Sequence, residues 1–148
     1  MEAFLETWNL TSLTRLFAAD PEALGDVDVT VPAQGDVICV TLKEKGDLDV
    51  FVTVSGDRDI LASVVLAPCD SLPNREAFER MVLKTHKFVP LSSFGITTMD
   101  GKEWYELFGS LSTKSPGDVV VEEVAILAAN AVDAAGMIEE WRNGEFSA

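Results

Sequence analysis

The residues of this sequence that could do chemistry are few: one histidine, two cysteines and several paired aspartates. His86 could act as a general base if a carboxylate lay within hydrogen-bond reach, and Glu103 or Glu106 could supply one. Cys69 could act as a nucleophile only if a nearby cation lowered its pKa, but the adjacent Asp70 is an anion. A single histidine after a helix is more typical of an end cap. We therefore expect no catalytic residue.

The paired aspartates raise the question of a calcium site, because hard cations bind clustered carboxylates. The pairs are Asp26 with Asp28, Asp47 with Asp49, and Asp57 with Asp59. None continues into an EF-hand loop or into the tandem nonapeptide of a calcium-binding β-roll. One histidine also excludes a histidine-rich metal site, and the sequence contains no phosphate loop or dinucleotide fingerprint. We expect neither a metal nor a cofactor.

Helix and strand signals indicate one α+β domain over residues 1–148. An N-terminal helix is predicted between the N-cap Asn9 and the terminator Asp20-Pro21. Its apolar residues recur at helical spacing: Leu10, Leu13, Leu16 and Phe17. Four strands are then predicted, each after a glycine–aspartate turn: Gly25-Asp26, Gly35-Asp36, Gly46-Asp47 and Gly56-Asp57. Their short spacing favours an antiparallel β-meander.

A second helix and a hairpin follow the meander. Asn74 is the predicted N-cap of the helix, which ends near His86 and Lys87. After a loop over 88–94, Asp100-Gly101 predicts a type I′ hairpin between strands over 95–99 and 102–108. Alternation in the second strand divides its residues between two faces. Trp104, Glu106 and Phe108 share one face, and Tyr105 and Leu107 share the other.

A long C-terminal helix is predicted to begin with Ser115 as N-cap and Pro116 at the first helical position. One apolar row alternates by four and three residues: Val120, Val124, Leu127, Ala131, Ala134, Ile138 and Trp141. A second row widens this stripe: Val121, Ala125, Ala128, Val132 and Ala135. We favour packing of the helix on the sheet. The alternative is self-association through Ala128, Ala131 and Ala135.

Charge and cysteine usage narrow the choice of partners. The 148 residues include 25 acidic and 11 basic side chains, so the formal net charge is −14. A phosphate backbone or an anionic bilayer would be repelled, and the uncharged segments are too short to span a membrane. We expect neither nucleic acid binding nor membrane insertion. Cys39 and Cys69 form no Cys-x-x-Cys motif, which favours the reducing cytoplasm.

Two segments carry a specific resemblance. They are His86-Lys87-Phe88-Val89-Pro90-Leu91-Ser92-Ser93-Phe94-Gly95-Ile96 and Tyr105-Glu106-Leu107-Phe108-Gly109-Ser110-Leu111-Ser112. Together they resemble the YjfI family of small bacterial proteins. The resemblance implies a cytoplasmic protein that is often encoded beside homologues of phage-shock protein A, and it implies no catalytic residue. The element order is also similar to type III secretion chaperones and YbjN-like proteins, which implies protein binding, commonly by a homodimer.

We therefore expect a non-enzymatic adaptor or chaperone-like protein, with a phage-shock protein A homologue as the candidate partner and a homodimer as the candidate assembly. The candidate binding surface comprises His86, Lys87, Ser93, Phe94, Trp104, Tyr105, Glu106 and Phe108. Of the five aromatic residues in this region, including Phe88, we expect three to be buried.

A rival hypothesis is a small ligand-binding domain or enzyme with a pocket between the hairpin and the His86 loop. Its polar groups would be His86, Ser93, Tyr105 and Glu106. The rival requires the His86 ring and the Tyr105 hydroxyl to converge in one cleft.

Overall fold

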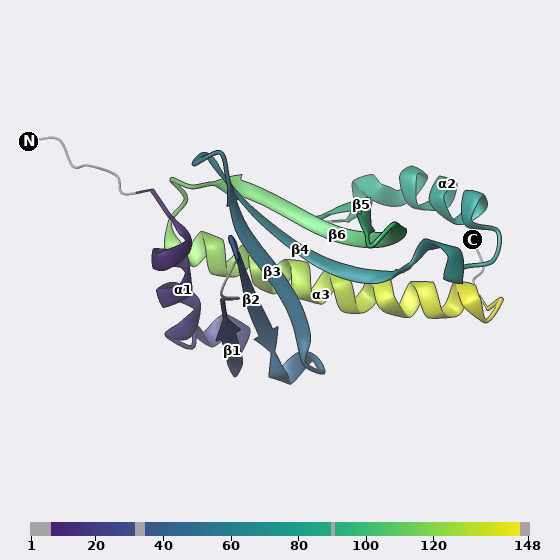
Figure 1. Cartoon of the computed structure of the whole chain (residues 1–148). Helices are drawn as coiled ribbons and strands as arrows, with labels where there is room; N and C mark the ends of the chain where they lie inside the picture. Colours follow the sequence, from purple (N-terminus) through teal and green to yellow (C-terminus); the bar gives the residue numbers. More distant parts are fainter. Residues whose placement is uncertain (1–6, 32–34, 90, 146–148) are drawn as a thin grey trace, which may run out of the picture.

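The protein is a six-stranded antiparallel sheet with helices packed against it, as seen in a computed structural model that describes residues 7–31, 35–89 and 91–145 (Figure 1). The helices are α1 (Leu10–Ala18), α2 (Arg75–Thr85) and α3 (Gly117–Arg142). The strands are β1 (Val27–Thr30), β2 (Val37–Leu42), β3 (Leu48–Ser55), β4 (Asp59–Pro68), β5 (Ser93–Met99) and β6 (Lys102–Ser112). Their spatial order is β1-β2-β3-β4-β6-β5. The predicted α+β class and element order are confirmed.

Local turn chemistry explains where the strands begin. Gly56 and Asp57 both adopt positive φ between β3 and β4, with Arg58 N–H donating to the Ser55 carbonyl across the turn. Asp100 and Gly101 do the same between β5 and β6, as a type I′ turn requires. The four strands of the meander and the Asp-Gly hairpin are therefore confirmed. The hairpin is longer than predicted, because β5 begins at Ser93 and β6 continues to Ser112.

The larger of two hydrophobic cores lies between one face of the sheet and the helices α1 and α3. The strands contribute alternate residues to it, including Val50 and Val52 of β3 and Ile60, Ala62 and Val64 of β4. Leu13 and Phe17 of α1 enter the same core. From α3, the first predicted row is buried from Val120 to Ile138, so the prediction that this helix packs on the sheet is confirmed.

A β-bulge in β4 creates a second, smaller core. The register with β6 shifts between Val65 and Ala67, so the alternation of inward side chains changes at this point. Beyond the bulge, Phe78 of α2 packs against Tyr105 of β6 and Trp141 of α3, with ring centroids 5.1 Å and 5.3 Å away. The Trp141 indole N–H donates a 2.7 Å hydrogen bond to the Pro73 carbonyl. The bulge therefore lets α2 and the end of α3 share one core.

The predicted helix caps have different outcomes. Asn9 caps α1 through a reciprocal capping box with Ser12, as expected. Asn74 is the N-cap residue of α2, as predicted, but it adopts the left-handed conformation and its side chain makes no capping bond. Ser115 is not the N-cap of α3, which begins at Gly117 after Pro116. Instead the Ser115 carbonyl accepts a 2.6 Å bond from the Trp8 indole and ties the start of α3 to the segment before α1.

The alanines proposed for self-association divide between core and surface. Ala128 and Ala131 are 0% and 1% exposed within one chain. A dimer seam through these two residues is therefore wrong, because the sheet already covers them. Ala135 and Val132 of the second row are exposed, since the helix rotates this row away from the sheet along its length.

Candidate protein-binding surface

Of the helices that the structure describes, none packs on one of the two faces of the sheet. The residues of β2, β3, β4 and β6 that alternate with the core residues point to this side, which we call the open face. A row of directly paired residues crosses it from strand to strand: Cys39, Phe51, Ser63, Phe108 and Ser93. All five are half-buried, which is typical of side chains on an uncovered sheet. The open face therefore presents aromatic and small side chains to whatever approaches it.

The β6 part of the open face combines two aromatic rings with a carboxylate. Trp104, Glu106 and Phe108 are half-buried and lie on one side of β6, as the alternation predicted. A Cβ atom added to Gly95 of the neighbouring strand would lie 3.0 Å from Cε1 of Phe108 and 3.5 Å from Oε1 of Glu106. The absence of a side chain at Gly95 thus makes room for both groups. Burial raises the pKa of Glu106.

The other side of β6 carries a polar network under α2. The buried Tyr105 donates its hydroxyl proton to Oε2 of Glu79 at 3.2 Å. The same oxygen accepts from Nε of Arg75 at 2.9 Å, and this guanidinium also contacts Glu103 at 3.2 Å. Burial and the Glu79 charge raise the pKa of Tyr105 well above its usual range. The network holds α2 on the sheet, and the Tyr105 hydroxyl forms its hydrogen bond within it.

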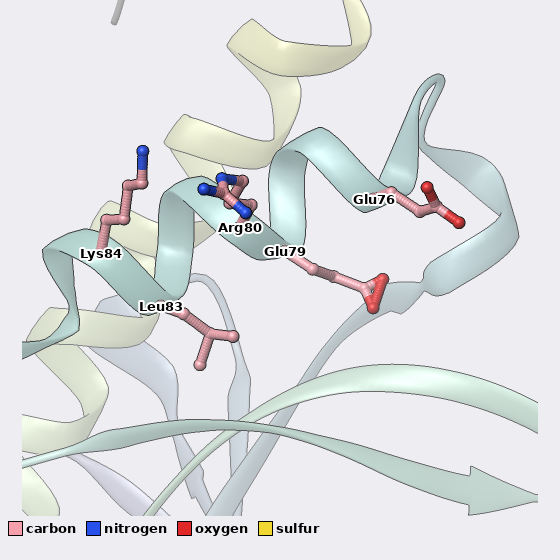
Figure 2. A pocket seen from close by; sticks show the side chains of 5 residues that line it. All are labelled: Glu76, Glu79, Arg80, Leu83 and Lys84. Atoms are coloured by element: carbon pink, nitrogen blue, oxygen red, sulfur yellow. The ribbon is translucent and has the colours of Figure 1, made fainter.

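A cavity of about 240 Å³ adjoins this network, between α2 and the hairpin. Phe78, Phe94 and Ile96 give it an apolar wall, and Leu83 lies at its margin with 76% of its surface exposed. Figure 2 shows a separate hollow on α2, which shares Glu79 and Leu83 with this cavity: both side chains extend toward the strands, while Lys84 extends away from them. Phe88, in the 3-10 turn after α2, is also 76% exposed.

The rival hypothesis of a ligand-binding pocket is contradicted by the structure, because its four polar groups do not converge. Ser93 and Glu106 belong to the open face, whereas Tyr105 points to α2 and bonds Glu79. His86 lies in a short 3-10 turn after α2 and does not line the cavity beside Tyr105. Its Nδ1 atom is buried and makes no hydrogen bond with any residue that the structure describes.

The predicted surface residues therefore form separate groups. Ser93, Trp104, Glu106 and Phe108 lie together on the open face, and Phe94 and Tyr105 lie on the helix side. Lys87 is exposed on the 3-10 turn, with its ammonium 5.4 Å from the Phe88 ring centroid. The expectation of three buried aromatic residues is wrong: of the five, only Tyr105 is fully buried, because the open face lacks a second layer.

The cysteines differ in burial. Cys69 is fully buried in the smaller core, as expected, whereas Cys39 is half-buried on the open face. Burial is the main reason that the pKa of each thiol is raised, which leaves both as poor nucleophiles. Within residues 7–31, 35–89 and 91–145 there is no group of three histidine, cysteine or acidic residues suited to hold a metal ion. No helix in the same ranges combines the length and apolar character needed to cross a bilayer.

Sequence reasoning missed Glu123, a buried carboxyl on α3. It is 9% exposed and lies against Gly109 of β6, where an added Cβ atom would overlap its Oε1 and lie 3.1 Å from the Leu91 carbonyl oxygen. Burial and the neighbouring Glu122 raise the pKa of Glu123. A glutamate beside the predicted core row was the only signal for this site, and it is indistinguishable from a surface glutamate until the helix rotation is known.

Replacing Glu123 with glutamine should stabilise the protein at neutral pH. The folded state binds the Glu123 proton more tightly than the unfolded chain, so this group opposes folding increasingly as pH rises above the ordinary value of 4.5 through its raised pKa. Urea unfolding at pH 5 and pH 8 should show a larger gain for Glu123→Gln at pH 8. Glu140→Gln, an exposed change on the same helix, should show no such gain. An equal effect of Glu123→Gln at both pH values would contradict the prediction.

The solved structures that share this fold include two complexes. The crystal structure of the ExsC–ExsE complex matches with a TM-score of 0.61 and 18% identity, covering 88% of this chain and 97% of that chain. The Yersinia pestis type III secretion chaperone SycH, in complex with a stable fragment of YscM2, matches with a TM-score of 0.54 and 15% identity, covering 81% and 97%. These matches confirm the secretion-chaperone-like layout.

Relatives in sequence cover nearly the whole chain. Uncharacterized protein YjfI of Escherichia coli strain K12 is 30% identical over 135 residues, which are 91% of this chain and 98% of that protein. YjfI of Escherichia coli O157:H7 matches to the same extent. The family model DUF2170, described as an uncharacterized protein conserved in bacteria, matches residues 7–142. The resemblance carried by the two segments is thereby confirmed, and the chain belongs to the DUF2170 family, together with YjfI.

Proposed function

We propose that the protein is a non-enzymatic, chaperone-like protein of the bacterial cytoplasm that binds another protein on its open face. The observation that carries this proposal is the uncovered sheet surface, which presents Phe51, Trp104 and Phe108 beside small side chains. An apolar sheet face without a second layer is suited to cover by a partner chain. The two solved structures with this fold support the proposal, because each contains a second component in complex.

The charge of the chain supports a cationic, amphipathic partner segment. At a net charge of −14 the protein attracts basic segments over long range and repels acidic ones. Apolar side chains of such a segment would cover the aromatic residues of the open face, while its basic side chains would meet the acidic surroundings. Long-range attraction of this kind weakens when salt screens exposed charges.

The proposal has two finer parts. The partner is a homologue of phage-shock protein A, which is supported by the gene association that the YjfI resemblance implies. The chain also forms a homodimer. This part is supported by the exposed apolar side chains of Leu83, Phe88 and Leu91, at α2 and in the segment before β5.

A capture experiment with a matched pair of variants tests the proposal. Phe108→Gln should lower the affinity for a purified phage-shock protein A homologue by at least about tenfold, because it replaces an aromatic ring of the open face with a polar amide. Val132→Gln, on the exposed side of α3, should bind as the wild type does. Binding of the wild type should weaken between low and physiological salt, and sizing of the free protein should give a dimer.

Thermal melting of both variants confirms that they are folded before capture. Equal binding by Phe108→Gln and the wild type would contradict the open face as the binding surface. Capture of a different protein with the same Phe108 dependence would keep the chaperone-like role and reject the phage-shock partner. A monomer at all concentrations would reject the homodimer.

A further inference from the structure

We propose that Glu106 is the anchoring site for an arginine or lysine side chain of a protein segment bound to the open face. The inference rests on the proposed function and deepens it, because it names the group that the surface recognises. Glu106 occupies the middle of β6, paired with Val65 of β4 on one side and with Gly95 of β5 on the other. A cation placed here would lie over β6, one strand in from the sheet edge that β5 forms.

The carboxylate of Glu106 has no partner in the described part of the chain. Among the residues that the structure describes, no cation lies within salt-bridge distance of it and no donor forms a hydrogen bond with it. By contrast, two glutamates on the helix side of the sheet have a cationic partner. Glu79 of α2 and Glu103 of β6 both contact Arg75. A half-buried carboxylate that lacks a partner gains from a charge-assisted hydrogen bond, because part of its desolvation has already occurred.

The aromatic neighbours of Glu106 suit a cation with an apolar stem. Phe108 and Glu106 approach the same point above Gly95, so a ring edge and a carboxylate oxygen border one small region. Trp104 lies two residues away on the same side of β6, and the Lys102 ammonium is 5.7 Å from its ring centroid. This ring therefore already contacts a cation of the chain itself. The methylene groups of an arginine or lysine would pack on these rings while its head reached the carboxylate.

The negative charge of the chain also favours a basic side chain at this site. Asp49 is exposed at another position of the open face, and the whole chain carries −14. This field raises the local concentration of basic groups at the sheet and disfavours acidic ones. The combination of a negative surround, one carboxylate without a partner and two flanking rings thus identifies a basic side chain as the group bound.

NMR titration with a small probe tests the inference without a known partner. N-acetyl-arginine methylamide, added at low salt to the ¹⁵N-labelled full chain, should bind saturably in about the millimolar range and shift the amides of Glu106, Gly95 and Phe108. The uncharged citrulline analogue should not bind there. Glu106→Gln should weaken the arginine probe at least about fivefold. Asp49→Asn removes the same charge from the same face and should leave binding unchanged.

Two results would overturn the inference: arginine-induced shifts scattered over the acidic surface, or equal binding by Glu106→Gln and Asp49→Asn. Its failure is distinguishable from failure of the proposed function. If Phe108→Gln abolishes partner capture while Glu106→Gln has no effect, the chaperone-like role stands and the anchoring site falls. If the arginine probe binds at Glu106 but no protein is bound on the open face, the anchoring site stands and the chaperone-like role falls.

Discussion

Replacing Ala131 with glutamate should destabilise the folded state by about 4 kcal/mol, a large part of the stability of a domain of this size. Ala131 is 1% exposed in the row of α3 that contacts the sheet. Its neighbours in the larger core, including Leu127 and Ala134, are apolar, so the new carboxylate would lose its hydration and find no compensating partner. Urea unfolding, followed by circular dichroism, measures the change.

Ala135→Glu is the matched control, because it makes the same change one helical turn later at an exposed position. It should alter stability by less than about 0.5 kcal/mol. If both variants were equally stable, the rotation of α3 on the sheet would be different from the one described. A folded Ala131→Glu protein that merely changed from dimer to monomer would restore the discarded seam.

Replacing Phe78 with alanine should cost about 3–5 kcal/mol, the usual range for a buried aromatic ring. Phe78 is 0% exposed and contacts both Tyr105 and Trp141, so its removal leaves a cavity between α2, β6 and the end of α3. The nearby hydrogen bond between the Trp141 indole and the Pro73 carbonyl limits the collapse of this space. Thermal unfolding and tryptophan fluorescence together report the effect.

Leu83→Ala is the control on the same helix, because Leu83 is largely exposed. It should change the unfolding free energy by less than about 0.5 kcal/mol. A small effect of Phe78→Ala would mean that α2 contributes little to the fold and that its position depends mainly on the Arg75–Glu79–Tyr105 network.

Local signals predicted most of the fold. The Gly56-Asp57 and Asp100-Gly101 turns depend only on residues next to them in the chain, so their strands could be located from the sequence. The period of α3 likewise predicted the buried row that includes Ala131. The pairing of β4 with β6 was not predictable in this way, because it joins Ala62 to Gly109 across the whole α2 segment.

The candidate site was harder to predict than the fold. Alternation correctly grouped Trp104, Glu106 and Phe108, but it does not say which face of a sheet receives a helix. Whether a helix packs on that face depends on the tertiary arrangement of the elements. The open face receives none of the described helices, so fewer aromatic residues are buried than expected. The helix starts were predicted less accurately than the helices themselves. Asn74 is the N-cap of α2 but makes no side-chain capping bond, and α3 begins one residue later than expected, with Pro116 as its N-cap.

The position of α3 in the chain has a consequence for biosynthesis. The central strand β4 is made long before β6, its neighbour on one side, and the helix that covers the larger core is made after both. A nascent chain that has reached Pro68 thus exposes an unpaired strand edge and an uncovered apolar sheet surface. The complete core cannot form on the ribosome until α3 has emerged, so this protein is itself vulnerable to aggregation while it is being translated.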